Sequence, residues 1–327
     1  MKTRTELHRH LDVAMPIATL HELAQSAGLI GESTSLKSFQ EKVVIRRPLS
    51  DLNDVLSRFT LYQKVLYCRG AIERMSESAA LQCAAEGLTH VELRYSPSFV
   101  SAFSSVTWED ALSAIESGIQ KAKLKVPHLH TGLICIASRE YGPDAVAETV
   151  DFYLKHAHRF VGVDLAGNEA ENPCHLFEDA FRPVKQAKQT NPEKIHVTIH
   201  AGEASGPENV WEALDLLGAE RIGHGVRSLE DPLLIQHLIS KQIPLENCPT
   251  SNILTRAARS YDSHPIKTFL DLGVPVTLST DDPSIFGVTY QHEIDCITKY
   301  LGLRQADLDH LEATAQSVSF IPHDSNK

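Results

Sequence analysis

Three observations in the sequence predict an α/β fold, a (β/α)8 barrel of the TIM type. Short apolar or β-branched runs alternate with segments of helical spacing, and this alternation implies parallel strands joined by right-handed crossovers. Eight such runs can be placed in a chain of 327 residues, which is long enough for eight strand–helix units. Several runs end in histidine or are closely followed by histidine or aspartate, as expected of a barrel with its active site at the carboxyl ends of its strands.

The candidate strands follow one another at intervals that leave room for helices. They are Thr5–His10, Thr89–Tyr95, Thr131–Ala137, Phe160–Ala166, Lys194–His200, Arg221–Gly223, Ile243–Glu246 and Val274–Ser279. Helical spacing between them is clearest over Arg69–Glu86, Val210–Leu217 and Pro232–Ile239. An open doubly wound sheet is the alternative fold. No Gly-x-Gly-x-x-Gly follows the first strand, which disfavours the nucleotide-binding form of that alternative.

The connection between the first two strands is too long for one simple crossover. Residues 21–69 hold several short helical patterns, one of which places Leu52, Val55, Leu56 and Phe59 at helical spacing. Active sites of barrels are built from the connections that follow the strands. We therefore expect a helical lid inserted between strands one and two of a single domain spanning residues 1–327. Extra packing on the barrel exterior is the alternative.

Composition narrows the class of partner. The formal net charge is -11 and no basic cluster is present, which argues against nucleic acid as a partner. We expect a small neutral or cationic substrate. No segment approaches the roughly 20 apolar residues of a membrane span, and the first residues lack the apolar stretch of a signal peptide. The six cysteines form no Cys-x-x-Cys pair, so reduced thiols and a cytoplasmic location are expected. The oligomeric state stays open.

Histidines at the ends of two candidate strands suggest a metal site. His8 and His10 point to the same face of a strand, because side chains alternate along it. His200 ends the fifth candidate strand and Asp281 follows the eighth. Each of these residues taken singly is more often structural, and His196, on the same strand as His200, is interpreted that way. Taken jointly, three imidazoles and a carboxylate form a donor set that suits Zn²⁺.

Two further groups could manage protons beside such an ion. Glu203 follows His200 through two small residues, and a buried carboxyl group there could act as a general acid. A carboxylate partner for a helix N-terminus is its ordinary role. His224 lies between two glycines, where an exposed turn is the alternative. Asp282 stands next to Asp281, and like charges so close normally need a cation or hydrogen bonds nearby.

Seven segments that run in order along nearly the whole chain match the pattern of one family. They are Glu6–Asp12, Val91–Pro97, Asp164–Gly167, His200–Glu203, Arg221–Gly225, Asn247–Pro249 and Ser279–Pro283. Together they resemble the adenosine deaminase family of the amidohydrolase superfamily. The resemblance implies a (β/α)8 barrel that uses one Zn²⁺ to remove the 6-amino group of a purine by hydrolysis, a step of purine and nucleotide metabolism.

The resemblance also implies a role for each matching residue. The zinc ligands would be His8, His10, His200 and Asp281. Glu203 would protonate N1 of the purine, and His224 would orient the attacking water and, with Asp281, handle its proton. On the substrate, Asp282 would bond to N7, the Gly167 N–H to N3, and Asp12 to a sugar hydroxyl. Val55, Leu56 and Phe59 fall where the family's lid forms an apolar wall.

Two departures bear on the substrate. The family usually has glycine where this chain has Val13, and aspartate where it has Asn168. Both changes put the sugar side of the pocket in doubt and leave the zinc chemistry alone. Asp12 favours a nucleoside, adenosine or 2'-deoxyadenosine. Free adenine, aminodeoxyfutalosine and N6-substituted purines remain alternatives.

Two other classes of function remain open. One is a different amidohydrolase reaction on the same metal. Branches of the superfamily that catalyse such reactions often use two metals bridged by a carboxylated lysine. Here Asp164 and His200 stand where that lysine would be expected, at the ends of strands four and five. A non-catalytic nucleoside-binding relative is the other, and the complete set of polar site residues argues against it.

Overall fold

Eight parallel strands form the centre of the molecule. The structure is a computed structural model and describes residues 3–48 and 58–322. The strands are β1 (Thr5–His10), β2 (His90–Tyr95), β3 (His130–Ser138), β4 (Gly162–Ala166), β5 (Thr198–Ala201), β6 (Arg221–His224), β7 (Leu245–Asn247) and β8 (Val276–Leu278). Each of the eight predicted strands is therefore present.

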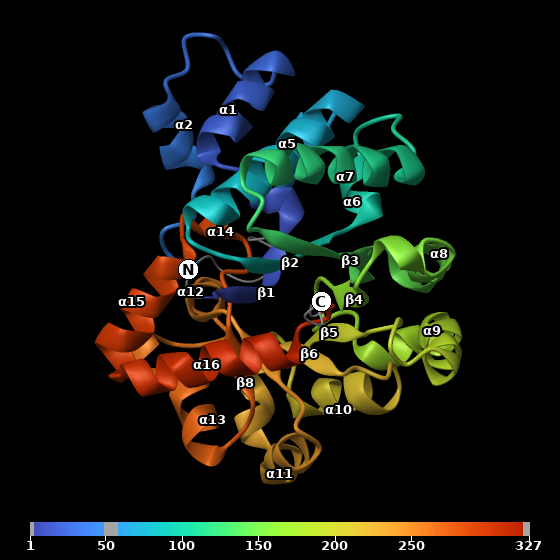
Figure 1. The fold of residues 1–327 in the computed structure, drawn as a ribbon, viewed down its shortest axis with the longest axis vertical. Helices are drawn as coiled ribbons and strands as arrows, with labels where there is room; N and C mark the ends of the chain where they lie inside the picture. Colours follow the sequence, from blue (N-terminus) through green and yellow to red (C-terminus); the bar gives the residue numbers. More distant parts are fainter. Residues whose placement is uncertain (1–2, 49–57, 323–327) are drawn as a thin grey trace.

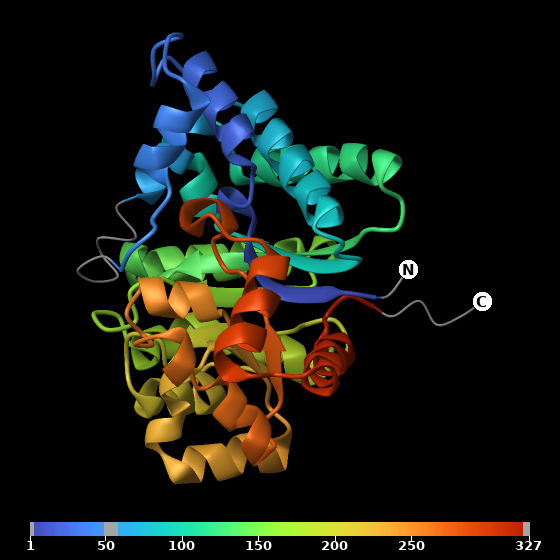
Figure 2. The same ribbon diagram turned by 90° about the vertical axis from the view of Figure 1, so that its left-hand side faces the viewer.

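The strands close into a barrel. Two four-stranded parallel sheets have the orders β1-β2-β3-β4 and β5-β6-β7-β8. A bridge between Val163 and Val197 joins β4 to β5, and a bridge between Arg9 and Asp281 joins the chain after β8 to β1. Figures 1 and 2 show helices surrounding the strands. The predicted (β/α)8 barrel is confirmed.

The helices follow the strands in alternation. Their bounds are α1 (Ile17–Ser26), α2 (Leu36–Val43), α4 (Phe59–Val65), α5 (Arg69–Ala85), α6 (Pro97–Ser101), α7 (Trp108–Lys125), α8 (Gly142–Lys155), α9 (Glu178–Thr190), α10 (Pro207–Asp215), α11 (Pro232–Lys241), α12 (Pro249–Leu254), α13 (Ile266–Leu272), α14 (Pro283–Phe286), α15 (Tyr290–Leu301) and α16 (Gln305–Val318). The helices predicted after Cys68 and Asp231 are confirmed as α5 and α11, and the Asp231 carboxylate accepts the Leu233 N–H at 2.8 Å as an N-cap.

The fifth strand is shorter than the sequence predicts. It begins at Thr198, whereas the apolar alternation begins at Lys194. The N–H groups of Lys194 and Ile195 bond to the carbonyl of Asn191, and the N–H of Val197 bonds to a side chain, that of Glu220. These donors are therefore used in a turn and are not available to a strand partner.

The long connection after β1 holds the helices α1, α2 and α4. In Figures 1 and 2 the helices α1 and α2 form a projection at one end of the molecule. The chain then returns to the barrel, where the Ile45 N–H bonds to the carbonyl of Ile285 at 2.7 Å and Val44 packs against Gly287. The connection is thus anchored to α14, which directly follows Asp282.

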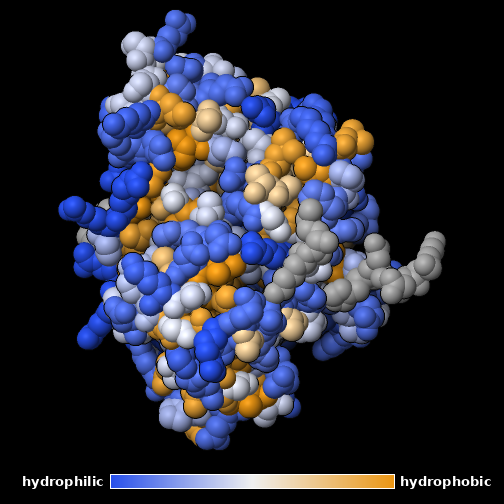
Figure 3. Space-filling view, turned by 60° about the vertical axis from the view of Figure 1, so that its left-hand side comes forward, coloured by the Kyte–Doolittle hydropathy of each residue, from blue (hydrophilic) through white to orange (hydrophobic). Residues whose placement is uncertain are grey.

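The cysteines, the absence of a membrane span and the character of the surface were the remaining points that composition addressed. All six cysteines lie in described segments and are free thiols, five of them buried. Within residues 3–48 and 58–322, no helix is long and apolar enough to cross a membrane. The face shown in Figure 3 is mixed, with polar side chains separating the apolar ones.

Candidate active site

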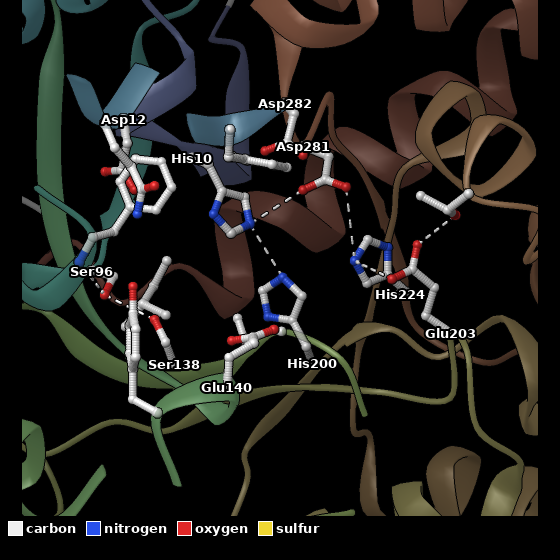
Figure 4. A pocket seen from close by; sticks show the side chains of 18 residues that line it. His10, Asp12, Ser96, Ser138, Glu140, His200, Glu203, His224, Asp281 and Asp282 are labelled. Atoms are coloured by element: carbon white, nitrogen blue, oxygen red, sulfur yellow. Dashed lines mark hydrogen bonds and ion pairs between the residues drawn. The ribbon is translucent and has the colours of Figure 1, made fainter. Parts of the chain in front are cut away.

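A cavity of about 220 Å³ opens at the carboxyl ends of the strands. Its lining includes side chains that follow β1, β2, β3, β4, β5, β6 and β8. We divide most of the polar side chains labelled in Figure 4 into two groups. We call the first the histidine side, with His10, His200, Glu203, His224 and Asp281. We call the second the serine side, with Asp12, Ser96, Ser138 and Glu140.

Four predicted ligands converge on the histidine side. One donor atom from each of His8, His10, His200 and Asp281 lies within 4.8 Å of the others. His10 Nε2 is 3.2 Å from His200 Nε2 and 3.2 Å from Asp281 Oδ1. His8 Nε2 is 3.4 Å from the same carboxylate oxygen. Residues from β1, from β5 and from the segment after β8 are thereby brought together, although His8 and Asp281 are 273 positions apart in the sequence.

The distances between these donors fit a metal ion. Two ligand atoms that each lie 2.0–2.1 Å from one ion at a tetrahedral angle are about 3.3 Å apart, close to the 3.2 and 3.4 Å separations found here. Two facing imidazole nitrogens can share at most one proton in an ordinary hydrogen bond, but both can bind a cation. The buried Nε2 of His8 makes no close hydrogen bond, and Asp281 Oδ1 at 3.4 Å is a long contact for one. The donor set therefore suits a divalent ion.

A buried ionic network orients two of the imidazoles from behind. His8 Nδ1 lies 2.8 Å from Glu246 and His200 Nδ1 lies 3.1 Å from Asp164. Arg94 bonds to both carboxylates at 2.8 Å, and Arg221 contacts Glu246 at 2.7 Å. With Nδ1 engaged in each ring, Nε2 is left to face the common centre, as is usual for metal-binding histidines.

Burial sets the charge of most imidazoles in the site. Burial lowers the pKa of His200 to about 3 and that of His224 to about 4, and it lowers the pKa of His10. These rings are therefore neutral at pH 7, the form that binds metals. His8 differs: burial and Arg94 act to lower its pKa, but hydrogen bonds to Asp281 and Glu246 raise it overall. These carboxylates favour a positive charge at this position, which a bound cation supplies.

Glu203 has the properties of a proton donor. Burial, assisted by the negative charge of Asp281, raises its pKa to about 8, so the carboxyl group is largely protonated at neutral pH. The Thr255 hydroxyl donates to Oε1 at 2.8 Å, and His224 lies 3.7 Å from Oε2. Glu203 is in a loop before α10 and not in a first helical turn. Its ordinary alternative role, at a helix N-terminus, does not apply.

His224 and Asp281 share an unusual backbone conformation. Their φ angles are 63° and 65°, in the left-handed region that non-glycine residues seldom adopt. Such conformations persist at functional sites where the surroundings hold them. Asn252 holds His224 by a 3.0 Å contact between Nδ2 and Nδ1, and Ser251 donates to Asp281 at 2.6 Å. His224 Nε2 is 3.9 Å from Asp281, and the alternative of an exposed turn is excluded by its burial.

The pKa values of the adjacent carboxyl groups of Asp281 and Asp282 are shifted in opposite directions. Burial alone would raise the pKa of Asp281, but hydrogen bonds to His10 and His8 hold it well below its usual range. Burial and the negative charge of Asp281 raise the pKa of Asp282 well above its usual range. This shift favours the protonated form of Asp282, which can donate a hydrogen bond, and its Oδ1 is a buried atom without a partner.

In the described part of the chain, the side chains of the serine side are held by hydrogen bonds and not by an ionic network. Ser138 donates to Ser96 at 2.9 Å, and the buried Asp12 keeps one carboxyl oxygen without a partner. Glu140 accepts the Asn168 N–H at 2.7 Å and lies against Gly167, where a Cβ atom would collide with its carboxylate. Gly167 also has a φ of +113°, which favours glycine. No Lys or Arg is present among the described residues that line the cavity.

The remaining predicted site residues have mixed outcomes. Phe59 lines the cavity from α4, whereas Val55 and Leu56 lie outside the described residues. Val13 is fully buried in the apolar core, and Asn168 uses its side chain to accept the Ala170 N–H. Neither Val13 nor Asn168 lines the cavity. These two departures from the family pattern therefore do not change the pocket wall directly.

Several cavity residues were not found from the sequence. They are Gln63, Ser96, Phe99, Ile136, Ser138, Glu140, Tyr141, Ala166 and Thr255. Ser96 and Ser138 each directly follow a predicted strand, next to the strand-end position that His10 and His200 occupy in theirs, and that position is the signal that could have found them.

The parallel (β/α)8 barrel, with polar side chains at the carboxyl ends of its strands, places this protein in the class of (β/α)8-barrel enzymes. A family profile described as adenosine deaminase matches residues 3–327. The chain is similar to an adenosine deaminase of Shewanella loihica, with 34% identity over 322 residues, 98% of this chain and 95% of the relative. The chain therefore belongs to the adenosine deaminase family and is a hydrolytic deaminase of the amidohydrolase type.

Solved structures agree with this fold. The chain is similar to an adenine deaminase from Arthrobacter aurescens, with a TM-score of 0.88, 26% identity, and coverage of 99% of this chain and 95% of that one. It is also similar to an N6-methyl-AMP deaminase from Arabidopsis thaliana, with a TM-score of 0.82, 26% identity, and coverage of 98% and 93%. The names of these relatives include a nucleoside, a free base and a nucleotide as substrates.

Proposed function

We propose that this protein hydrolytically deaminates a 6-aminopurine nucleoside, with adenosine or 2'-deoxyadenosine as substrate and inosine or deoxyinosine and ammonia as products. The observation that carries the proposal is the convergence of three imidazoles and one carboxylate beside a protonated Glu203. Zinc, held by His8, His10, His200 and Asp281, would supply a water activated near neutral pH.

Two side chains move protons in the proposed reaction. Glu203, protonated at neutral pH because its pKa is about 8, donates to N1 of the purine and makes C6 more electrophilic. His224 is neutral because its pKa is about 4, so it can accept a proton from the attacking water. The 3.7 Å between His224 and Glu203 supports this pairing of a base with an acid.

Other groups orient the base. N7 of a purine is a hydrogen-bond acceptor, so its partner must donate. Asp282, whose pKa is raised by burial and by Asp281, can do so in its protonated form. The left-handed conformation of Gly167 and its place in the cavity wall support the assignment of its N–H to N3. Phe59 supplies apolar surface from α4, consistent with a lid formed by residues 21–69 in a single domain of residues 1–327.

The charge of the serine side favours a nucleoside over a nucleotide. Glu140 supplies an exposed carboxylate to this side, and the described part of the lining offers no cation to a phosphate. Burial raises the pKa of Asp12 to about 8, so Asp12 is largely protonated at neutral pH and adds little charge. Arg139, which directly precedes Glu140, is turned away and bonds to the carbonyls of His200 and Asn172 at 2.7 and 2.6 Å. A 5'-phosphate here would meet negative charge without compensation. Ser96, Ser138 and Asp12 can instead bond to sugar hydroxyls.

Ammonia release from a substrate panel tests the proposal. The zinc-loaded protein should turn over adenosine and 2'-deoxyadenosine faster than adenine, aminodeoxyfutalosine, AMP or N6-methyl-AMP. Metal content near one zinc per chain should accompany activity. Turnover of one of the other purines with adenosine untouched would replace the substrate, and a panel with no turnover at all would overturn the deaminase assignment.

A further inference from the structure

The loop that carries Glu203 is held by one buried carboxylate. This carboxylate belongs to Glu169, which lies in the connection after β4 and is only 2% exposed. Its Oε1 accepts the backbone N–H groups of Glu203 at 2.5 Å and Ser205 at 2.8 Å, together with that of Ala204. Its Oε2 accepts the N–H of Gly202 at 2.9 Å.

A fifth donor completes this arrangement. The Asn209 amide donates to Oε2 at 2.5 Å, and its carbonyl oxygen accepts the Cys174 N–H at 2.8 Å. Within the described residues no ion pair joins Glu169 to a cation. A buried carboxylate of this kind is stabilised by the N–H donors themselves, because charge-assisted hydrogen bonds are shorter and stronger than neutral ones. Four consecutive amides, Gly202 to Ser205, are therefore fixed by a single side chain.

We propose that Glu169 is a positioning residue for the proposed general acid: its carboxylate fixes the loop from Gly202 to Ser205 so that Glu203 faces His224. This inference depends on the proposed function, because it assigns a task to Glu203. Helix α10 begins only at Pro207, so no helical hydrogen bonds hold these four residues. Arg227 also contacts the backbone of this loop: its N–H bonds to the Gly202 carbonyl at 2.9 Å, and its guanidinium bonds to the Ala204 carbonyl at 3.3 Å.

The charge of Glu169 has a second consequence. A negative charge near Glu203 favours its protonated form, and Glu169 acts in this direction after burial and Asp281. The Thr255 hydroxyl acts in the opposite direction, because its hydrogen bond stabilises the ionised form. The groups around Glu203 are thus Asp281 and Glu169, which raise its pKa, and Thr255 and His8, which lower it; His224 lies 3.7 Å away.

Two substitutions at position 169 separate geometry from charge. In E169Q one oxygen becomes an NH2 group that faces backbone donors, so we expect kcat for adenosine to fall about 10–100-fold with KM little changed. Loss of the charge should also move the basic limb of the kcat/KM profile to lower pH. E169D keeps the charge but is one methylene shorter, so kcat should fall while the basic limb stays near its original pH. T255V should move the limb to higher pH.

Hydrogen–deuterium exchange of the metal-free protein provides a measurement that does not depend on activity. The amides of Gly202 to Ser205 should exchange faster in E169Q and E169D than in the unmodified chain. E193Q removes an exposed carboxylate and should change neither exchange nor kinetics. If E169Q does not fold, E169D alone decides by its kcat and its exchange.

The outcomes are distinguishable from a failure of the proposed function. An unmodified protein that leaves adenosine untouched would overturn the proposed function. An active protein whose E169D variant keeps both kcat and slow loop exchange, or whose folded E169Q variant keeps its kcat and its basic limb, would overturn the role of Glu169 alone.

Discussion

The histidine side and the serine side of the cavity differ in what lies behind them. Behind the histidine side, Arg94 and Arg221 tie together Asp164 and Glu246, and all four side chains are buried or nearly so. On the serine side, Ser96 and Ser138 bond to each other, and Glu140 is an exposed residue bonded to a backbone amide. The histidine side is held in place by buried ion pairs, and the described residues of the serine side are not.

This difference predicts unequal costs of substitution. Removing one partner of a buried ion pair leaves an uncompensated charge and costs about 3–5 kcal/mol. Exposed pairs are worth only about 0.2–1 kcal/mol. The reacting half of the site is therefore hard to change, whereas the half that faces the rest of the substrate can change at little cost in stability. The similar proteins described above agree with this pattern, because they share one fold and are named as deaminases of a nucleoside, a free base and a nucleotide.

The largest effect is expected from E203Q. Glutamine keeps the shape and the Thr255 contact but cannot donate the same proton, so kcat should fall about 10²–10⁴-fold. Metal content, measured by atomic absorption, should stay unchanged because Glu203 is not among the four converging donors. E193Q serves as the charge control. Retained activity in E203Q would mean that another group protonates the ring.

D164N tests the network behind the ligands. The His200 Nδ1 contact at 3.1 Å and the Arg94 contact at 2.8 Å would both lose the carboxylate charge. Metal affinity should fall about 10–100-fold, measured by competition with a chelator. D179N, at a side chain that is 85% exposed, is the control. Unchanged affinity would show that the network supports folding and not the metal site.

The pH profile tests the protonation of Glu203 directly. An acid with a pKa of about 8 donates only while protonated, so kcat/KM should hold below pH 8 and fall as the pH rises through about 8. A group with an ordinary carboxyl pKa would be ionised well below pH 7, and activity would fall there instead. Steady-state kinetics from pH 5 to pH 10, at constant ionic strength, would distinguish the two.

The sequence predicts the histidine side better than the serine side for a physical reason. His8, His10, His200 and Asp281 lie in or just after the carboxyl-terminal halves of strands β1, β5 and β8, and these halves meet at one mouth of a closed barrel. Imidazole and carboxylate groups at such points are chemically distinctive. Ser96, Ser138 and Glu140 occupy equivalent positions, but serine and exposed glutamate are common at strand and helix ends. The strand boundary at Lys194 was wrong because the Asn191 carbonyl takes its N–H, a local bond that apolar alternation does not reveal.

The smallest effect is expected on the serine side, from E140Q and E140K. Removing an exposed charge should raise kcat/KM for AMP relative to adenosine by up to about fivefold, and E140K should raise the ratio further because it supplies a cation. Turnover of adenosine should change less, since the Glu140 contact is to the Asn168 amide and not to the donors that bind metal. Both substrates should be assayed in one buffer at two salt concentrations, because screening reduces the effect of an exposed charge. A ratio that stays constant across both variants would place the selection against phosphate elsewhere, and Asp12, buried with one oxygen unpaired, would be the next residue to change.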